Sequence, residues 1–187
     1  MALRYAGAEE WTYADYARLP ADGRRYEIHE GVLCMPPSPA TLHQLVVVRL
    51  GFAMHRIISD LSLGIVFVAP YDVVLSDVSI VQPDVVFVSA ANKGIVTEEN
   101  IGGAPDLVVE VLSPGTKRID RGYKRSLYER SGGPEYWIVD PAAREVTLYS
   151  QAPGDRRYPR PRTCRDGDTI HSIVAPELAI SLTEVWS

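Results

Sequence analysis

What this sequence of 187 residues lacks excludes several classes of protein. It has only two cysteines, Cys34 and Cys164, without the paired spacing of a zinc site, so we expect two buried thiols in a reducing cytoplasm. No run of about 18 apolar residues occurs, so we expect no membrane span. Residues 1–5 lack the apolar core of a signal peptide.

A glycine-rich phosphate loop and a serine-elbow motif are also absent, so neither chemistry is supported. Positive charge is not in excess, because the net charge is −5. Basic residues nevertheless gather in two stretches, with six against two acids in 117–130 and five against two in 155–166. Such clusters are either phosphate-facing patches or, more simply, a solvated helix face and a surface loop.

The most informative residues that are present are two acids within apolar runs. Asp84 stands in the run 80–88, and Glu110 stands in the run 106–112. Runs that are apolar on both faces are typical of central strands, so we expect both acids in the middle of buried strands. A buried carboxylate is costly unless a cation, a metal or hydrogen-bond donors meet it. Two of them on neighbouring strands would suit a hard cation such as Mg²⁺.

The rest of the pattern predicts an α/β protein with a mixed sheet of four to six strands flanked by helices. We expect helices over 9–19, starting near Thr12 or Asp15, over 41–60, opened by a Thr41–Gln44 capping box, and over 118–131, with Asp120 as a possible cap. The expected strands are a hairpin over 26–35 and the segments 65–69, 71–75, 80–88, 107–112, 136–139 and 145–149.

One lysine shares the apolar stripe of the helix over 118–131. Lys124 lies on the same side as Leu127 and Tyr128, and this helix follows the Glu110 strand directly. The amine either reaches solvent and pairs with Asp120, or points at the two buried acids. In the second case it could orient an attacking water beside a divalent ion.

A family resemblance rests on several stretches. They are Arg25–Ile28 with Gly31, His43, Gln82–Asp84, Gly103–Pro114, Asp120 with Lys124 and Tyr128, and Glu135–Pro141. Together they resemble the Uma family of restriction-endonuclease-like proteins, in the PD-(D/E)XK nuclease superfamily, over about residues 10–187. The blocks 110–114 and 135–141 are the most specific part of the match.

This resemblance implies an α/β, restriction-endonuclease-like core in which a mixed central β-sheet is flanked by helices, with an N-terminal helix and hairpin. It implies a single domain over 1–187, with an N-terminal extension (1–40), a nuclease core (41–150) and a C-terminal extension (151–187). The implied activity is Mg²⁺- or Mn²⁺-dependent hydrolysis of phosphodiester bonds in DNA. We also expect a cytoplasmic homodimer, since cutting two strands suits two-fold symmetry.

The same resemblance suggests the site residues. Asp84 and Glu110 would bind the metal, and the Val111 carbonyl could join them. The superfamily's usual lysine falls two residues after the acid, where this sequence has Leu112. The resemblance therefore implies that Lys124 serves instead, from the next helix.

Accessory residues have two interpretations each. Glu27 could act on metal or water, or be a surface acid near Arg24 or Arg25. His43 could contact phosphate or metal near a helix N-terminus, or be a satisfied boundary residue. The remaining candidates for binding the nucleic-acid backbone are the arginines Arg118, Arg121 and Arg125.

Two other functions remain open. A catalytically inactive module could keep the fold and bind nucleic acid or a protein partner, as Leu112 in the lysine position would suggest. A purely structural protein, with the acids neutralised by arginines, is the third hypothesis. The combination of Asp84, Glu110 and Lys124 favours the enzyme.

Overall fold

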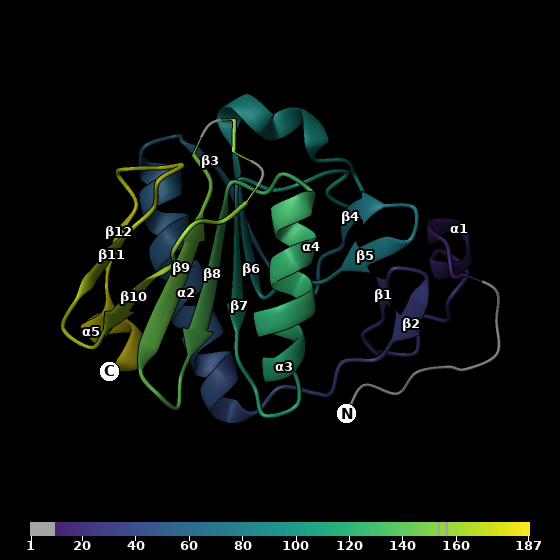
Figure 1. Ribbon diagram of the computed structural model, residues 1–187, viewed down its shortest axis with the longest axis horizontal. Helices are drawn as coiled ribbons and strands as arrows, with labels where there is room; N and C mark the ends of the chain where they lie inside the picture. The colour runs from purple at the N-terminus through teal and green to yellow at the C-terminus, as the bar shows by residue number, and fades with distance from the viewer. Residues whose placement is uncertain (1–9, 153, 156) are drawn as a thin grey trace.

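A six-stranded mixed sheet forms the centre of the computed structural model, which describes residues 10–152, 154–155 and 157–187. Its strand order is β10-β9-β8-β7-β6-β3, and only the β7–β8 pair is parallel (Figure 1). The strands are β3 (Gly64–Val68), β6 (Val85–Ser89), β7 (Leu107–Val111), β8 (Glu135–Asp140), β9 (Glu145–Ser150) and β10 (Arg162–Arg165). The predicted mixed sheet is therefore confirmed.

Helical layers cover both faces of this sheet (Figure 1). The long helix α2 (Thr41–Asp60) packs on one face, against the odd-numbered residues of β7 and β8. The other face is covered by a continuous helical segment made of α3 (Lys117–Ile119), the π-helical turn η2 (Asp120–Lys124) and α4 (Arg125–Arg130). Because side chains alternate along a strand, Glu110 faces this second layer together with Val108 and Leu112.

A second, four-stranded antiparallel sheet lies beside the first, in the order β2-β1-β5-β4 (Figure 1). Its strands are β1 (Glu27–His29), β2 (Val32–Cys34), β4 (Val73–Ser76) and β5 (Ser79–Val81). The predicted hairpin over 26–35 is confirmed as β1 and β2, which turn at Glu30–Gly31, both with positive φ. Pairing of β1 with β5 brings Glu27 close to the segment that follows Val81.

The expected single strand over 80–88 was wrong. The segment Gln82-Pro83-Asp84 separates β5 of the small sheet from β6 of the large one. Pro83 has no N–H to give to a ladder, and the backbone of Gln82 bonds instead to the side chains of Glu27 and Arg25. Asp84 therefore lies just before a strand, whereas Glu110 lies inside β7 as expected.

Two expected helix caps were also wrong. Thr41 is the first residue of α2 rather than its cap, and Ala40 holds the cap position without a side-chain hydrogen bond. Asp120 lies within the helical segment, in the π-helical turn. The first helix, α1, spans only Tyr13–Tyr16 and is capped at Thr12, whose N–H donates to Asp15. Residue 9, included in the expected helix, lies outside the described residues.

The remaining elements are η1 (Ala90–Ile95), the pair β11 (Thr169–His171) and β12 (Ala179–Ser181), and α5 (Leu182–Trp186). Leu182 and Val185 of α5 join the core between α2 and the large sheet. Among the helices that the structure describes, none has both the length and the apolar character that a membrane crossing requires.

Candidate active site

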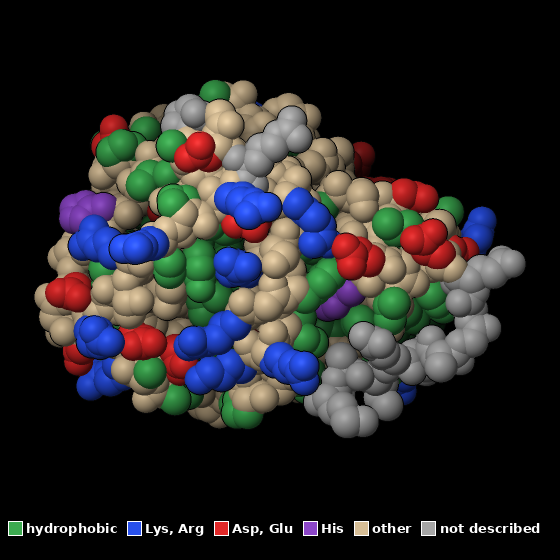
Figure 2. Space-filling view, in the orientation of Figure 1, with side chains coloured by type: hydrophobic (Ala, Val, Ile, Leu, Met, Phe, Trp, Pro, Cys, Tyr) green, Lys and Arg blue, Asp and Glu red, His purple; other side chains and the backbone are tan. Residues whose placement is uncertain are grey.

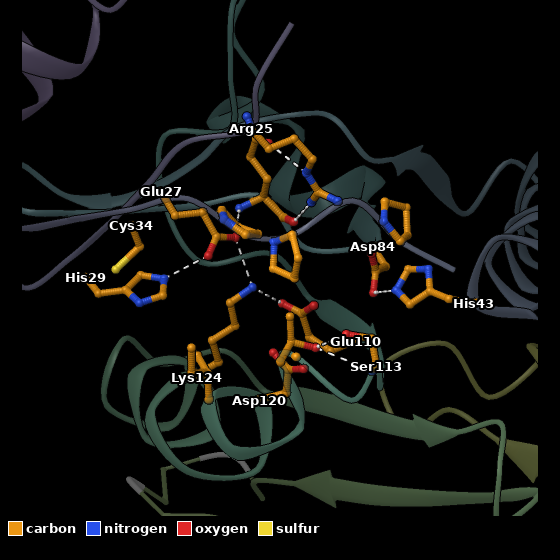
Figure 3. Close-up of a pocket in the computed structure, with 17 residues that line it drawn as sticks. Arg25, Glu27, His29, Cys34, His43, Asp84, Glu110, Ser113, Asp120 and Lys124 are labelled. Carbon is orange, nitrogen blue, oxygen red and sulfur yellow. Dashed lines mark hydrogen bonds and ion pairs between the residues drawn. The ribbon is translucent and has the colours of Figure 1, made fainter. Parts of the chain in front are cut away.

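A cavity of about 40 Å³ lies where the small sheet, the large sheet and the helical segment meet. Five buried charged side chains, each no more than 5% exposed, line it together with the partly exposed Arg25 (Figure 3). The five buried ones are Glu27, Asp84, Glu110, Asp120 and Lys124. Positions as far apart in the sequence as 27 and 124 therefore line one buried cavity.

The Lys124 amine lies between two carboxylates (Figure 3). Its Nζ donates to Oε1 of Glu27 and to Oε1 of Glu110, each at 2.9 Å. The Tyr128 hydroxyl, one helical turn later, donates to the same Glu110 oxygen at 3.3 Å. Among the described residues the lysine forms its ion pairs with these two acids and not with Asp120.

The π-helical turn supplies this lysine. Asp120 and Lys124 are the buried residues of the turn, and both line the cavity. The Asp120 carbonyl accepts the N–H of Arg125 and also, at 3.0 Å, the hydroxyl of Tyr136. A π-helical turn inserts one residue more than an α-helix needs, and such turns are frequent at functional sites.

Asp84 is fixed next to Glu110 by the backbone of β7. Its Oδ2 accepts the N–H of Val111 at 2.8 Å and lies 3.1 Å from Nε2 of His43. Within the described chain, Oδ1 of Asp84 and Oε2 of Glu110 have no hydrogen-bond partner. One oxygen of each carboxylate is thus left for another ligand.

These residues suit a hard cation. In the part of the chain that the structure describes, no cluster of three or more His, Cys, Asp or Glu side chains is arranged to hold a metal ion. Mg²⁺ needs fewer protein ligands, since it often binds through one or two carboxylates and keeps water and phosphate in its remaining positions. Asp84 and Glu110 fit that demand.

Glu27 is a buried part of the site, so its interpretation as a surface acid was wrong. Besides Lys124, its Oε1 accepts the backbone N–H of Gln82 at 2.9 Å, and its Oε2 lies 2.8 Å from Nε2 of His29. Arg25 supports this arrangement by donating to the Gln82 carbonyl at 2.6 Å. Sequence reasoning missed His29, although strand alternation places positions 27 and 29 on one face.

The electrostatics of the cavity are dominated by burial and by crowded acids. Burial raises the pKa of Glu110 well above its usual range, and Asp120, Asp84 and Glu27 add to the rise while Lys124 opposes it. Burial likewise raises the pKa of Asp120 to about 6, against the attraction of Lys124. Because four acids face a single lysine, a bound divalent cation would relieve their repulsion.

The neighbours of Glu27 lower its pKa, in contrast to the raised pKa values of Glu110 and Asp120. Burial alone would raise its pKa, but Lys124, His29 and the Gln82 N–H hold the pKa of this carboxyl below its usual range. Burial of His29 is likewise outweighed by Cys34 and Glu27, which raise its pKa to about 9. The two carboxylates on one lysine therefore have pKa values shifted in opposite directions, a pattern typical of acid–base pairs.

The candidates for nucleic-acid binding divide into two groups. His43 is buried beside Asp84 and lines the cavity, and its Nδ1 lacks a partner among the described residues. Arg118, Arg121 and Arg125 do not line it. Arg121 pairs with Asp140, and Arg125 lies over the Tyr149 ring. Lys and Arg side chains gather over the α3–α4 segment and the strands beside it (Figure 2).

Comparison with known proteins gives two findings. The family model Uma2, described as "Putative restriction endonuclease", matches residues 13–183. The chain is also similar to the crystal structure of "a putative nuclease belonging to DUF820 from Anabaena variabilis ATCC 29413", with a TM-score of 0.77 and 18% identity over 94% of this chain and 97% of that one. This likeness confirms the fold. No curated protein matches the chain.

Proposed function

We propose, since the chain belongs to the Uma2 family of putative restriction endonucleases, that it is a nuclease that hydrolyses phosphodiester bonds in DNA with a divalent metal ion. The observation that carries the proposal is the Lys124 amine, hydrogen-bonded to Glu110 in a cavity that Asp84 also lines. These are the residue types that metal-assisted phosphodiester hydrolysis requires.

Asp84 and Glu110 would hold Mg²⁺ or Mn²⁺ through the oxygens that the protein leaves unpaired, with the Val111 carbonyl as a third donor. When bound, the ion would lower the pKa of a water molecule and neutralise charge on the scissile phosphate. The contact between Asp84 and the Val111 N–H keeps the two acids side by side before any ligand arrives.

Lys124 and Glu27 would handle the water and the phosphate. The amine can donate to the attacking water or to the phosphate oxygens on which negative charge accumulates. Glu27, whose pKa is held low, stays ionised at neutral pH and can accept a hydrogen bond from that water or help to hold the metal. Its carboxylate shares the lysine with Glu110, so a change in one contact alters the other.

DNA would reach the site through its phosphates. His43 lies beside Asp84 near the start of α2, where an anion is favoured. We propose that Arg118, Arg121 and Arg125 hold the phosphate backbone along the basic helical segment. Contacts of this kind give affinity without sequence information.

We further propose a homodimer that works in the cytoplasm. The exposed apolar residues of α2 support the dimer. Leu45, Val48 and Phe52 lie on successive turns of this helix, and their exposed fractions are 47%, 64% and 68%. A contiguous exposed apolar surface commonly marks an interface. Supporting the compartment, Cys34 and Cys164 are both free thiols.

The test is plasmid cleavage in Mg²⁺ or Mn²⁺ by wild type and by Asp84→Asn, Glu110→Gln and Lys124→Met. We expect metal-dependent nicking by wild type and loss of at least about 100-fold in each variant, comparable to losing a group that stabilises transition-state charge. Glu98→Gln, an exposed acid outside the cavity, is the matched control. Equal cutting by wild type and Asp84→Asn would show that these residues do not catalyse the reaction.

The alternative is a catalytically inactive module. Leu112 in the superfamily's lysine position favours it, and so do the ion pairs of Lys124 with Glu27 and Glu110. Calorimetry with Mn²⁺ separates the two functions. Absence of binding at millimolar Mn²⁺, together with DNA binding that weakens with salt and never leads to cleavage, would establish the inactive module.

A further inference from the structure

A second, larger cavity of about 450 Å³ adjoins the candidate active site. The two cavities share His43 and Ser113 as lining residues, so they are separated by one side chain on α2 and one in the turn after β7. A volume of this size lies within the usual range of small-molecule sites. The 40 Å³ cavity around the acids is too small for more than an ion and a few waters.

The walls of this larger cavity come from three chain segments. Leu42 belongs to the first turn of α2, Leu112 and Pro114 follow β7, and Pro141 and Ala142 follow β8. Strands β7 and β8 are the parallel pair of the sheet, and both end at this place. In α/β sheets, ligands bind in crevices outside the carboxyl ends of such strands.

The chemistry of the walls selects for a flat, apolar group with a polar edge. The walls are mostly aliphatic, and the polar side chains among them are His43, Ser113, Lys117 and Asp140. The exposed Lys117 amine donates to the buried Asp140 carboxylate at 2.9 Å, so the charges in the wall form an ion pair and neither is isolated. A nucleobase has this character, with apolar faces and hydrogen-bonding edges.

The start of α2 supplies a place for the phosphate between the two cavities. Among the described residues, the backbone N–H groups of Thr41, Leu42 and His43 have no acceptor, and the cap residue Ala40 offers none. Free N–H groups at the start of a helix of 20 residues attract anions. This position lies next to His43, which faces Asp84 on its other side.

We infer that the larger cavity accepts one unpaired nucleobase of the DNA strand, and that the adjacent phosphate lies at the start of α2, beside His43 and the proposed metal site. The inference rests on the proposed function and makes it more specific. A base inside a duplex is stacked and paired and cannot enter a pocket without leaving the helix. The preferred substrate is therefore DNA that is single-stranded, or locally unpaired, beside the bond that is cut.

Binding without metal tests the inference separately from cleavage. The probe is a single-stranded DNA of roughly 12 nucleotides with a central 2-aminopurine, compared with the same strand in a full duplex and with a strand abasic at that position. We expect a fluorescence change on binding of the single strand, and about ten-fold weaker binding of the abasic strand and the duplex.

Two pairs of variants locate the effect. Ala142→Trp fills the cavity and should remove the preference for the intact strand, whereas Ala143→Trp, at the next exposed position outside the cavity, should keep it. Leu42→Asp places a charge in the wall, and Gln44→Asp places the same charge in the same exposed helical turn but outside the cavity. Only the first of each pair should weaken binding, by about ten-fold.

The outcomes distinguish the two proposals. Base-dependent binding that Ala142→Trp abolishes, without any cleavage in Mg²⁺, would support the pocket and reject the nuclease. Cleavage by wild type with equal affinity for intact and abasic strands, or with no effect of Ala142→Trp and Leu42→Asp, would reject the pocket and keep the nuclease.

Discussion

Lys124 shows how strongly one buried cation can organise acids that are distant in the sequence. Its amine faces Glu27 and Glu110, and burial would lower its pKa, but these two carboxylates and Asp120 raise the pKa well above its usual value. The lysine therefore stays charged while its partners share its hydrogen bonds. A buried ion pair adds little net stability as a unit, but removing one partner is costly because the other is left uncompensated.

We predict that Lys124→Met lowers the free energy of unfolding by about 3–5 kcal/mol in the absence of metal. Adding Glu27→Gln to this variant should recover part of the loss, because it removes one of the two acids left without a cation. Urea unfolding of the two single variants and the double variant measures the coupling. Strictly additive effects would mean that the two groups do not interact.

His29 gives a prediction about pH. Its pKa is 6.5 in the unfolded chain and about 9 in the folded protein, so the folded state holds more protons between these values. The stabilisation is complete below pH 6.5 and is lost as the pH rises through 9. The free energy of unfolding should fall over this interval by about 3 kcal/mol through this group.

The measurement is urea unfolding of wild type and His29→Gln between about pH 6 and about pH 9.5, a range that includes both pKa values of His29. The variant should lose stability at low pH and show a flatter profile than wild type. Parallel profiles would contradict the assigned role of the His29–Glu27 pair.

At the scale of elements, local sequence signals predict the strands and helices better than their ends. The helical period of apolar residues over 41–60 and 118–131 correctly predicts α2 and the α3–α4 segment. Alternation of apolar and polar residues correctly predicts the first hairpin. The caps were wrong because Thr41 and Asp120 have the right residue type without the right backbone position. The π-helical turn has no sequence signal, since one extra residue leaves composition and period almost unchanged.

The uncapped start of α2 leads to a prediction at this scale. Ala40→Asp should raise the free energy of unfolding by about 1 kcal/mol, because its carboxylate would accept from the free N–H groups of the first turn. The same carboxylate would repel a phosphate, so binding of single-stranded DNA should weaken. Thermal unfolding and the oligonucleotide titration measure the two effects.

Ala40→Ser is the matched variant, because it can cap the helix without a charge. It should stabilise similarly and weaken DNA binding less than Ala40→Asp. If both caps stabilise α2 and neither changes DNA binding, phosphate does not bind at this helix start.

At the scale of the whole molecule, the candidate site depends on contacts between sheets that no local pattern reveals. The sequence singled out Asp84, Glu110 and Lys124 because acids in apolar runs and a lysine on an apolar stripe are conspicuous. It could not show that Ile28 pairs with Ile80, and so could not decide whether Glu27 was buried. Arg25 and Gln82, which hold the junction of the two sheets, have no distinguishing local pattern for the same reason.

The exposed apolar face of α2 gives the prediction about assembly. Phe52→Lys should convert a dimer into a monomer, because it places a charge in the proposed interface at its most exposed apolar residue. Since Phe52 is 68% exposed, the fold of the monomer should be unaffected. Sedimentation velocity at micromolar protein measures the state. Leu61→Lys, at the end of α2 and 52% exposed, is the control. A wild-type protein that sediments as a monomer would contradict the proposed dimer.

The segment Gln82-Pro83-Asp84 has a consequence for the life of the protein in the cell. This segment connects the two sheets and includes Asp84, a proposed metal ligand. Lys124, the other main residue of the proposed site, comes 40 positions later in the chain. In a polypeptide still emerging from the ribosome, or in one that has partly unfolded, these residues are therefore not yet assembled into the proposed site. The proposed nuclease would therefore be inactive until both sheets and the α3–α4 segment have packed together.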